Sequence, residues 1–227
     1  MNKTRKLWVT VTILGLLTAA LAGLIFPYFP ENGYAISAGY GGAVYAFEMA
    51  RVPADLIAVF GPKTDPEHAA RIAAMDKGNL WDYAFMPAYA LFMTTFLWAA
   101  YQETGRKVWT FFAGIGLLSG FADAIENAIL LGITANFETA PFLSLLAFPV
   151  WIKFFSITLA VAAAGIFIFQ QKHVFKIAGL LTALSMIAVF MAFYDASRFG
   201  ALSGQAIGIA WGIMLIYAAS KCLIKTP

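Results

Sequence analysis

The sequence contains little cysteine, histidine or charge, and each shortage excludes a class of protein. A single cysteine, Cys222, permits no internal disulfide and no CxxC metal site. The two histidines are too differently placed for a bis-histidine haem. No nucleotide-binding loop is present, and no basic stripe with interleaved aromatic residues suggests a nucleic-acid partner. We therefore expect no metal, no cofactor and no nucleic acid.

The scarcity of charge defines the general class of the protein. Charged residues make up 12% of the 227 residues and hydrophobic residues 61%, which lies outside the range of soluble domains. The sequence therefore predicts an all-α, polytopic integral membrane protein.

Six apolar runs are long enough to cross a bilayer as helices. The first continues for a full span, so we interpret it as a retained helix and not as a cleaved signal peptide. We found no internal repeat of the kind that marks inverted-repeat transporters. The prediction is a single transmembrane domain, residues 1–227, a bundle of six helices at 7–29, 82–101, 108–134, 142–169, 177–197 and 203–220.

Lysine and arginine distribution predicts the orientation of this bundle. The N-terminus, the connections 102–107 and 170–176 and the C-terminal tail are basic, whereas the alternate connections contain few basic residues. Apart from Lys153, which lies within a span, this arrangement places nine Lys and Arg residues on one side of the membrane and five on the other. Because basic residues stay cytoplasmic, we expect a multi-pass protein of the plasma (inner) membrane with both termini in the cytoplasm.

The segment 30–80, between the first two spans, is predicted to form an external helical lid or a re-entrant segment. Its glycine-rich part, 33–50, is apolar enough to resemble a seventh span, but a seventh span would reduce the charge asymmetry to eight against six. A short helix is expected between Pro53 and Gly61. A second amphipathic helix is expected from an N-cap at Asp65 to a terminator at Gly78, with His68 on its solvated face.

The third span carries polar residues where hydrocarbon should surround it. Asp123, Glu126 and Asn127 occupy positions i, i+3 and i+4, which places them on one helix face. Lys153, in the fourth span, lies at nearly the same depth. Charges inside a membrane turn towards the bundle interior and find partners, so we expect Lys153 to pair with Glu126 or Asp123.

Other polar and aromatic residues are candidates for the same region. Asp82 either caps the second span together with Asn79 or contributes to a binding site. Glu48 and Arg51, one helical turn apart, either pair with each other or face the polar cluster. The remaining candidates for substrate contact are Tyr83 and Tyr89, which could instead be packing residues, and Asp195, which could instead be part of the membrane interface.

These patterns leave three functional hypotheses. The first is an outward-facing intramembrane pocket that binds a small lipid or isoprenoid-like molecule, and that could convert it by acid/base chemistry of the isomerase, cyclase or lyase type, with Asp123, Glu126 and Lys153 as catalytic residues. The second is a small transporter or proton-coupled channel. The third is a non-catalytic membrane subunit. A purely structural clamp between the third and fourth spans remains an alternative role for the polar cluster.

The sixth span carries three glycines spaced four residues apart on one face. Gly204, Gly208 and Gly212 form the small-xxx-small pattern that lets helices approach closely. They predict a contact with another helix, either in this chain or in a homo- or hetero-oligomer. Membrane lipids are the other expected partners.

Overall fold

The computed structural model describes residues 3–171 and 175–223, and six of its helices are long and apolar enough to cross a membrane. These are α1 (Lys3–Ile25), α4 (His68–Thr104), α5 (Val108–Ala135), α6 (Ala147–Phe169), α7 (Lys176–Tyr194) and α8 (Ala196–Leu223). No strand occurs in the described ranges. The chain is thus an all-α polytopic membrane protein, as its composition predicts. Lys172 and Lys225, counted above with the cytoplasmic charge, lie outside the described residues.

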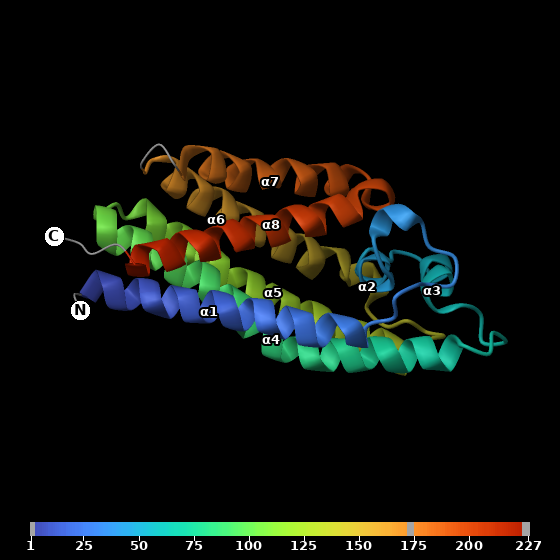
Figure 1. Cartoon of the computed structure of the whole chain (residues 1–227). Helices are drawn as coiled ribbons and strands as arrows, with labels where there is room; N and C mark the ends of the chain where they lie inside the picture. The colour runs from blue at the N-terminus through green and yellow to red at the C-terminus, as the bar shows by residue number, and fades with distance from the viewer. Residues whose placement is uncertain (1–2, 172–174, 224–227) are drawn as a thin grey trace.

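The six long helices form a closed ring. Each packs against the next along the chain, and α1 closes the ring by contacting both α4 and α8. α6 also contacts α4 and α8 across the ring, so it is the most buried span. Both ends of the chain lie at one end of the bundle, and α2 (Ala43–Glu48) and α3 (Pro53–Phe60) lie at the other (Figure 1). We call these the terminal end and the lid end.

At the lid end, the segment between α1 and α4 forms a compact cover. It contains a 3₁₀ turn at Phe26–Tyr28, a second at Ala38–Tyr40, and then α2 and α3. α2 has six residues, far fewer than a membrane span requires, so residues 33–50 do not form a seventh span. Pro53 begins α3 and Gly61, with φ of 79°, ends it, as predicted. We call residues 29–42, which lead to α2, the strap. Main-chain hydrogen bonds from Tyr34 to Val59 and from Ala35 to Ala58 hold the strap against α3.

The second span begins earlier than predicted. α4 is one helix of 37 residues, about 55 Å long, so it extends well beyond a hydrocarbon core of about 30 Å. The predicted separate helix ending at Gly78 is therefore wrong. The ring of Phe29 packs against Gly78, where a Cβ would collide with it, so this glycine serves close packing and not termination. Asp65, the predicted N-cap, accepts a hydrogen bond from the Glu67 amide just before the helix begins.

Other helix ends also differ from the prediction. The predicted connection 198–204 is helical, and α7 and α8 are separated by Asp195 alone. The fourth span, predicted from residue 142, runs from Leu143 to Phe169; it opens with a 3₁₀ turn at Leu143–Leu145, and its α-helix begins at Ala147. His68 is buried and not solvated, because its Nδ1 lies 2.9 Å from the Gly61 carbonyl oxygen and its ring meets Phe137 edge-on.

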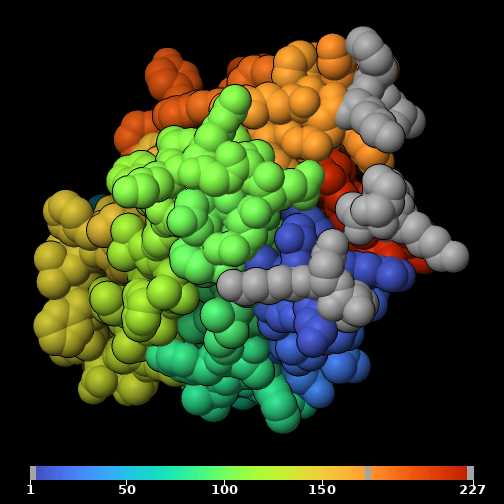
Figure 2. Space-filling model, turned by 90° about the vertical axis from the view of Figure 1, so that its left-hand side faces the viewer, coloured from blue at the N-terminus to red at the C-terminus, as the bar shows by residue number. Residues whose placement is uncertain are grey.

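The terminal end is tightly packed. Trp8 contacts the rings of Phe96, Phe167 and Tyr217, which come from three other spans. Its Nε1 donates to Glu103, and Lys221 pairs with the same carboxylate at 2.6 Å. Figure 2 shows this end face with the α4–α5 connection, in light green, at its centre and no hollow among the coloured atoms.

Candidate functional site

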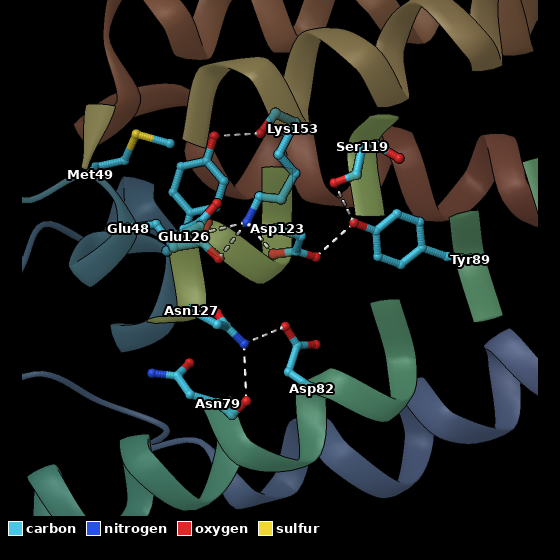
Figure 3. A network of polar contacts seen from close by, with 12 residues as sticks. Glu48, Met49, Asn79, Asp82, Tyr89, Ser119, Asp123, Glu126, Asn127 and Lys153 are labelled. Atoms are coloured by element: carbon cyan, nitrogen blue, oxygen red, sulfur yellow. Dashed lines mark hydrogen bonds and ion pairs between the residues drawn. The ribbon is translucent and has the colours of Figure 1, made fainter. Parts of the chain in front are cut away.

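The polar face of α5 meets Lys153 of α6 inside the bundle. Nζ of Lys153 lies 2.7 Å from Oε1 of Glu126 and 3.3 Å from Oδ1 of Asp123. Both predicted pairs are therefore confirmed. All three side chains are almost completely buried, with 5% or less of each residue exposed. The i, i+3 spacing on α5 brings both carboxylates to the same ammonium (Figure 3).

The lid contributes a third carboxylate to this ammonium. Oε1 of Glu48, on α2, lies 3.0 Å from Nζ of Lys153. Burial raises the pKa of the Glu48 carboxyl, and the nearby lysine acts in the opposite direction. The predicted pair between the Glu48 and Arg51 side chains does not form. Arg51 instead donates to the main-chain oxygens of Glu48 and Ala50, and its burial lowers its pKa.

α4 supplies a second layer of contacts. The Tyr89 hydroxyl donates to Oδ2 of Asp123 at 2.7 Å, and it also lies 3.3 Å from the Ser119 carbonyl oxygen. Nδ2 of Asn127 donates to Oδ2 of Asp82 at 3.1 Å and to the Asn79 carbonyl oxygen at 3.0 Å. Asp82 and Asn79 lie within α4 and do not cap it, so the predicted capping role is wrong. The network thus joins α2, α4, α5 and α6.

A neighbouring hydrogen bond connects the lid to α8. The hydroxyls of Tyr45 and Ser203 lie 3.0 Å apart. Burial raises the pKa of Tyr45 to about 12, so its hydroxyl keeps its proton at neutral pH. The sequence analysis missed this pair. A signal was present, because Tyr45 precedes Glu48 by one helical turn and therefore shares its face.

Two predicted contact residues lie away from this network. Tyr83 is exposed on α4 and its hydroxyl donates to the Ala124 carbonyl oxygen at 3.3 Å. Asp195, between α7 and α8, accepts a hydrogen bond from the Ser197 hydroxyl at 2.7 Å. Neither lines the cavity described next, and nor does Arg51. The structure therefore places these three residues outside the cavity wall, although Arg51 contacts the main chain of Glu48.

A cavity of about 1070 Å³ opens beside the network. Its walls come from α1, α4, α8 and the lid, with Asp123, Asn127 and Lys153 reaching it from α5 and α6. In Figure 1, α1 and α8 are close at the terminal end and diverge towards the lid end. Asp82, Tyr89 and Glu48 also line this cavity, whereas Glu126 lies behind its wall.

The glycine face of α8 borders the same cavity. Gly204, Gly208 and Gly212 are exposed and line it, and a Cβ on any of them would meet no atom within 4 Å. On the facing side of α1, Gly15 and Thr18 line the cavity. The glycines thus border open space and do not support a close contact within this chain. Because the structure contains one chain, the predicted oligomer contact stays a prediction.

The site bears no resemblance that would name its ligand. The chain matches no protein family, no curated protein and no solved structure. Among the residues that the structure describes, no group of three or more His, Cys, Asp or Glu side chains is placed to hold a metal ion. The function must therefore be argued from the cavity itself.

Proposed function

We propose that this protein binds a small lipophilic or amphiphilic molecule in the intramembrane cavity. Ligand pockets are concave, mostly apolar and carry a few converging polar groups, and their volumes range from about 300 to 1000 Å³. The volume of this cavity is of that order. An apolar passage between α1 and α8, which we call the corridor, leads to a polar end at Asp82, Asp123 and Lys153. That combination is the observation on which the proposal depends.

The position of the glycines supports entry from the side. Gly204, Gly208 and Gly212 are exposed along a transmembrane helix while also lining the cavity, so the corridor borders the protein surface at the level of the spans. An acyl or isoprenoid chain could then move in from the bilayer without crossing water. The small residues leave the width that such a chain needs.

The polar network supports a role beyond a clamp between two helices. A clamp requires one carboxylate and Lys153, yet this ammonium contacts three carboxylates, that of Glu48 on α2 and those of Asp123 and Glu126 on α5. Asp82 and Asn127 extend the polar wall further along the cavity. Ionisable groups inside a membrane mark functional sites more often than structural ones.

We also infer that the lid faces the exterior and that both termini face the cytoplasm of a plasma (inner) membrane. Most basic residues at the terminal end lie in the first turn of a span or in a short connection: Arg5 and Lys6 at the start of α1, Arg106 and Lys107 between α4 and α5, and Lys176 at the start of α7. Such residues favour the cytoplasmic side. The polar end of the cavity then opens in the outer half of the bilayer.

The test of binding is a photo-crosslinking experiment in lipid nanodiscs. The probes are C16 chains that carry a diazirine and end in an amine, an alcohol or a carboxylic acid. We expect at least one probe to crosslink to residues of the cavity wall. Gly208→Leu should reduce this crosslinking by about tenfold, because its side chain fills the corridor at a cost of about 1–3 kcal/mol to the ligand.

The matched control is Gly114→Leu. Gly114 is also an exposed glycine within a span, and a Cβ there also meets nothing within 4 Å, but it does not line the cavity. It should leave crosslinking unchanged. Equal crosslinking of both variants by every probe, or crosslinking spread over all lipid-facing helices, would refute the proposed function.

A further inference from the structure

The cavity beside the polar network has a closed inner end. The lining residues furthest from the lid are Gly15 on α1, Phe92 on α4 and Leu215 on α8. A Cβ on Gly15 would lie 2.8 Å from Cε2 of Phe92 and 2.9 Å from Cδ1 of Leu215, so both side chains pack on the face of this glycine. We call these three residues the floor, because they close the space between the three helices.

Beneath the floor, aromatic side chains fill the bundle. Phe96 follows Phe92 by one helical turn on α4. Its ring meets the rings of Trp8, Phe167 and Tyr217. These four rings, those of Phe96 and its three neighbours, come from four spans, and none of the four residues is more than 2% exposed or lines the cavity. We call them the plug, because within the described part of the chain they leave this cavity no continuation towards the terminal end.

The floor lies close to the middle of the spans. Phe92 is central in the apolar run 82–101, and Gly15 lies about 5 Å beyond the middle of the run 7–29, at about 1.5 Å per residue. A hydrocarbon core is about 30 Å thick, so the cavity occupies mainly the half on the lid side. The protein therefore offers its ligand the depth of one leaflet.

The depth of the cavity matches one extended hydrocarbon chain. On α4 the lining extends from Asn79 to Phe92, a rise of about 20 Å. On α8 it extends from Gly200 to Leu215, a rise of about 22 Å. A chain with C–C bonds of about 1.5 Å advances about 1.3 Å per carbon, so about 16 carbons span this depth.

Polar side chains reach the cavity on the lid side of the floor and not at the floor. Asp82 lies ten residues before Phe92 on α4. Asp123 accepts a hydrogen bond from Tyr89, which still lies three residues before Phe92. The polar group of a ligand therefore finds partners towards the lid, whereas at the floor it would be buried without a hydrogen bond. An apolar chain end suits the floor.

We propose that the cavity holds one hydrocarbon chain upright, with the polar group of the ligand towards the lid and the chain end on the floor. This inference rests on the proposed function and adds the orientation and the chain length of the ligand. A molecule held in this way stands as a lipid of the lid-side leaflet does. The floor and the plug stop it from passing to the other leaflet, so the protein binds its ligand from one leaflet and does not carry it across the membrane.

The experiment maps where the two ends of a bound chain crosslink in nanodiscs. The probe has whichever of the three C16 head groups labels the cavity most, and its diazirine is placed either at carbon 2 or at carbon 15. We expect the carbon-15 probe to label floor residues at least about tenfold more than Tyr40 and Val44 at the lid end of the cavity, because an unpaired polar group at the floor is disfavoured. The carbon-2 probe should give the opposite distribution. Equal distributions, or carbon-15 labelling on lipid-facing side chains outside the cavity, would overturn the proposal.

Phe92→Ala tests the floor itself. Truncation of this buried ring opens the wall towards Phe96, one helical turn or about 5.4 Å further from the lid. A C20 probe with its diazirine at carbon 19 should then label Phe96 about tenfold more in this variant than in the wild type, because the added carbons cover that turn. Phe167→Ala is the matched control, since it removes an equally buried ring from the plug and leaves the floor in place. It should keep the wild-type distribution.

Failure of this inference differs from failure of the proposed function. If the probes label the cavity but their chain ends lie at the lid or among the lipids, the cavity binds amphiphiles in another orientation. If the C20 probe labels Phe96 as strongly in the wild type as in Phe92→Ala, the floor does not stop the chain. If Phe92→Ala does not fold, the wild-type map with the C16 probes still decides the orientation. If no probe labels the cavity, the proposed function itself is refuted.

Discussion

Replacing Lys153 with methionine tests whether this ammonium balances the buried carboxylates. The substitution keeps the length and apolar character of the side chain but removes the cation that lies within 3.3 Å of Glu48, Asp123 and Glu126. One carboxylate that the lysine had balanced must then take up a proton when the protein folds. Glu48 is the natural acceptor, because burial already raises the pKa of its carboxyl.

The cost of that proton uptake sets the magnitude. A glutamate has a reference pKa of about 4.3, and each pH unit above it costs about 1.4 kcal/mol, so protonation at pH 7 costs about 3.7 kcal/mol. At pH 5 the same step costs about 1 kcal/mol. The raised pKa of the folded state means that the stability of the variant is fully present below about pH 4.3 and is lost as pH rises. The loss relative to wild type should therefore shrink as pH falls from 7 to 5.

The assay is equilibrium unfolding in mixed detergent micelles, followed by tryptophan fluorescence at pH 5, 6 and 7. Adding Glu126→Gln to Lys153→Met should recover about 2 kcal/mol or more at pH 7, because one carboxylate is removed with the ammonium and lost hydrogen bonds of about 1 kcal/mol remain. Lys221→Met is the control. It removes a partly exposed pair with Glu103 at the terminal end and should cost about 1 kcal/mol or less.

Two results would refute this reasoning. A loss below about 1 kcal/mol at pH 7 would show that the lysine is not the compensating charge. A loss of the expected size that stays constant between pH 5 and pH 7 would show that packing, and not proton uptake, determines the stability of this region.

Three further predictions concern other parts of the molecule. Gly165→Ala should destabilise the bundle by about 1–3 kcal/mol, because its Cβ would lie 2.5 Å from the Ala183 nitrogen of α7. The control Gly132→Ala, where a Cβ meets nothing, should not destabilise the bundle. Equal unfolding curves for the two variants would contradict this prediction. His68→Ala should increase proteolysis within the lid, since it removes the bond to Gly61 and the ring contact with Phe137; an unchanged cleavage rate would argue against this anchoring role. After removal of the native cysteine, Glu138→Cys in intact cells should react with a membrane-impermeant maleimide and Lys107→Cys should not; the reverse pattern would invert the proposed orientation.

Much of the fold follows from the apolar runs, because length and hydropathy determine whether a helix can cross a bilayer. The helix ends were harder to predict. Gly78 and the neighbouring polar residues indicate a stop when read locally, but Phe29 packs against this glycine and the helix continues. Likewise, the glycines between residues 198 and 204 suggest a loop, although α8 runs through them. Tertiary packing overrides local propensity at both places.

The core of the site was predictable for a related reason. Helical periodicity alone places Asp123, Glu126 and Asn127 on one face of a helix. A buried carboxylate needs a cation as its partner, and Lys153 is the cation that the neighbouring span supplies. The contribution of the lid was not predictable in the same way. Glu48 has Arg51 one turn away, so local spacing favours a surface pair, and only the path of the strap carries its carboxylate to Lys153 instead.

The order in which the network's charges are synthesised has a consequence for biogenesis. Glu48 precedes Lys153 by 105 residues and Glu126 precedes it by 27. At about 5–20 residues per second, the α5 carboxylates are synthesised about 1–5 s before their counter-ion. The nascent chain must therefore hold these acids as neutral carboxyls or keep them at the translocon until α6 arrives, and the lid closes after that step.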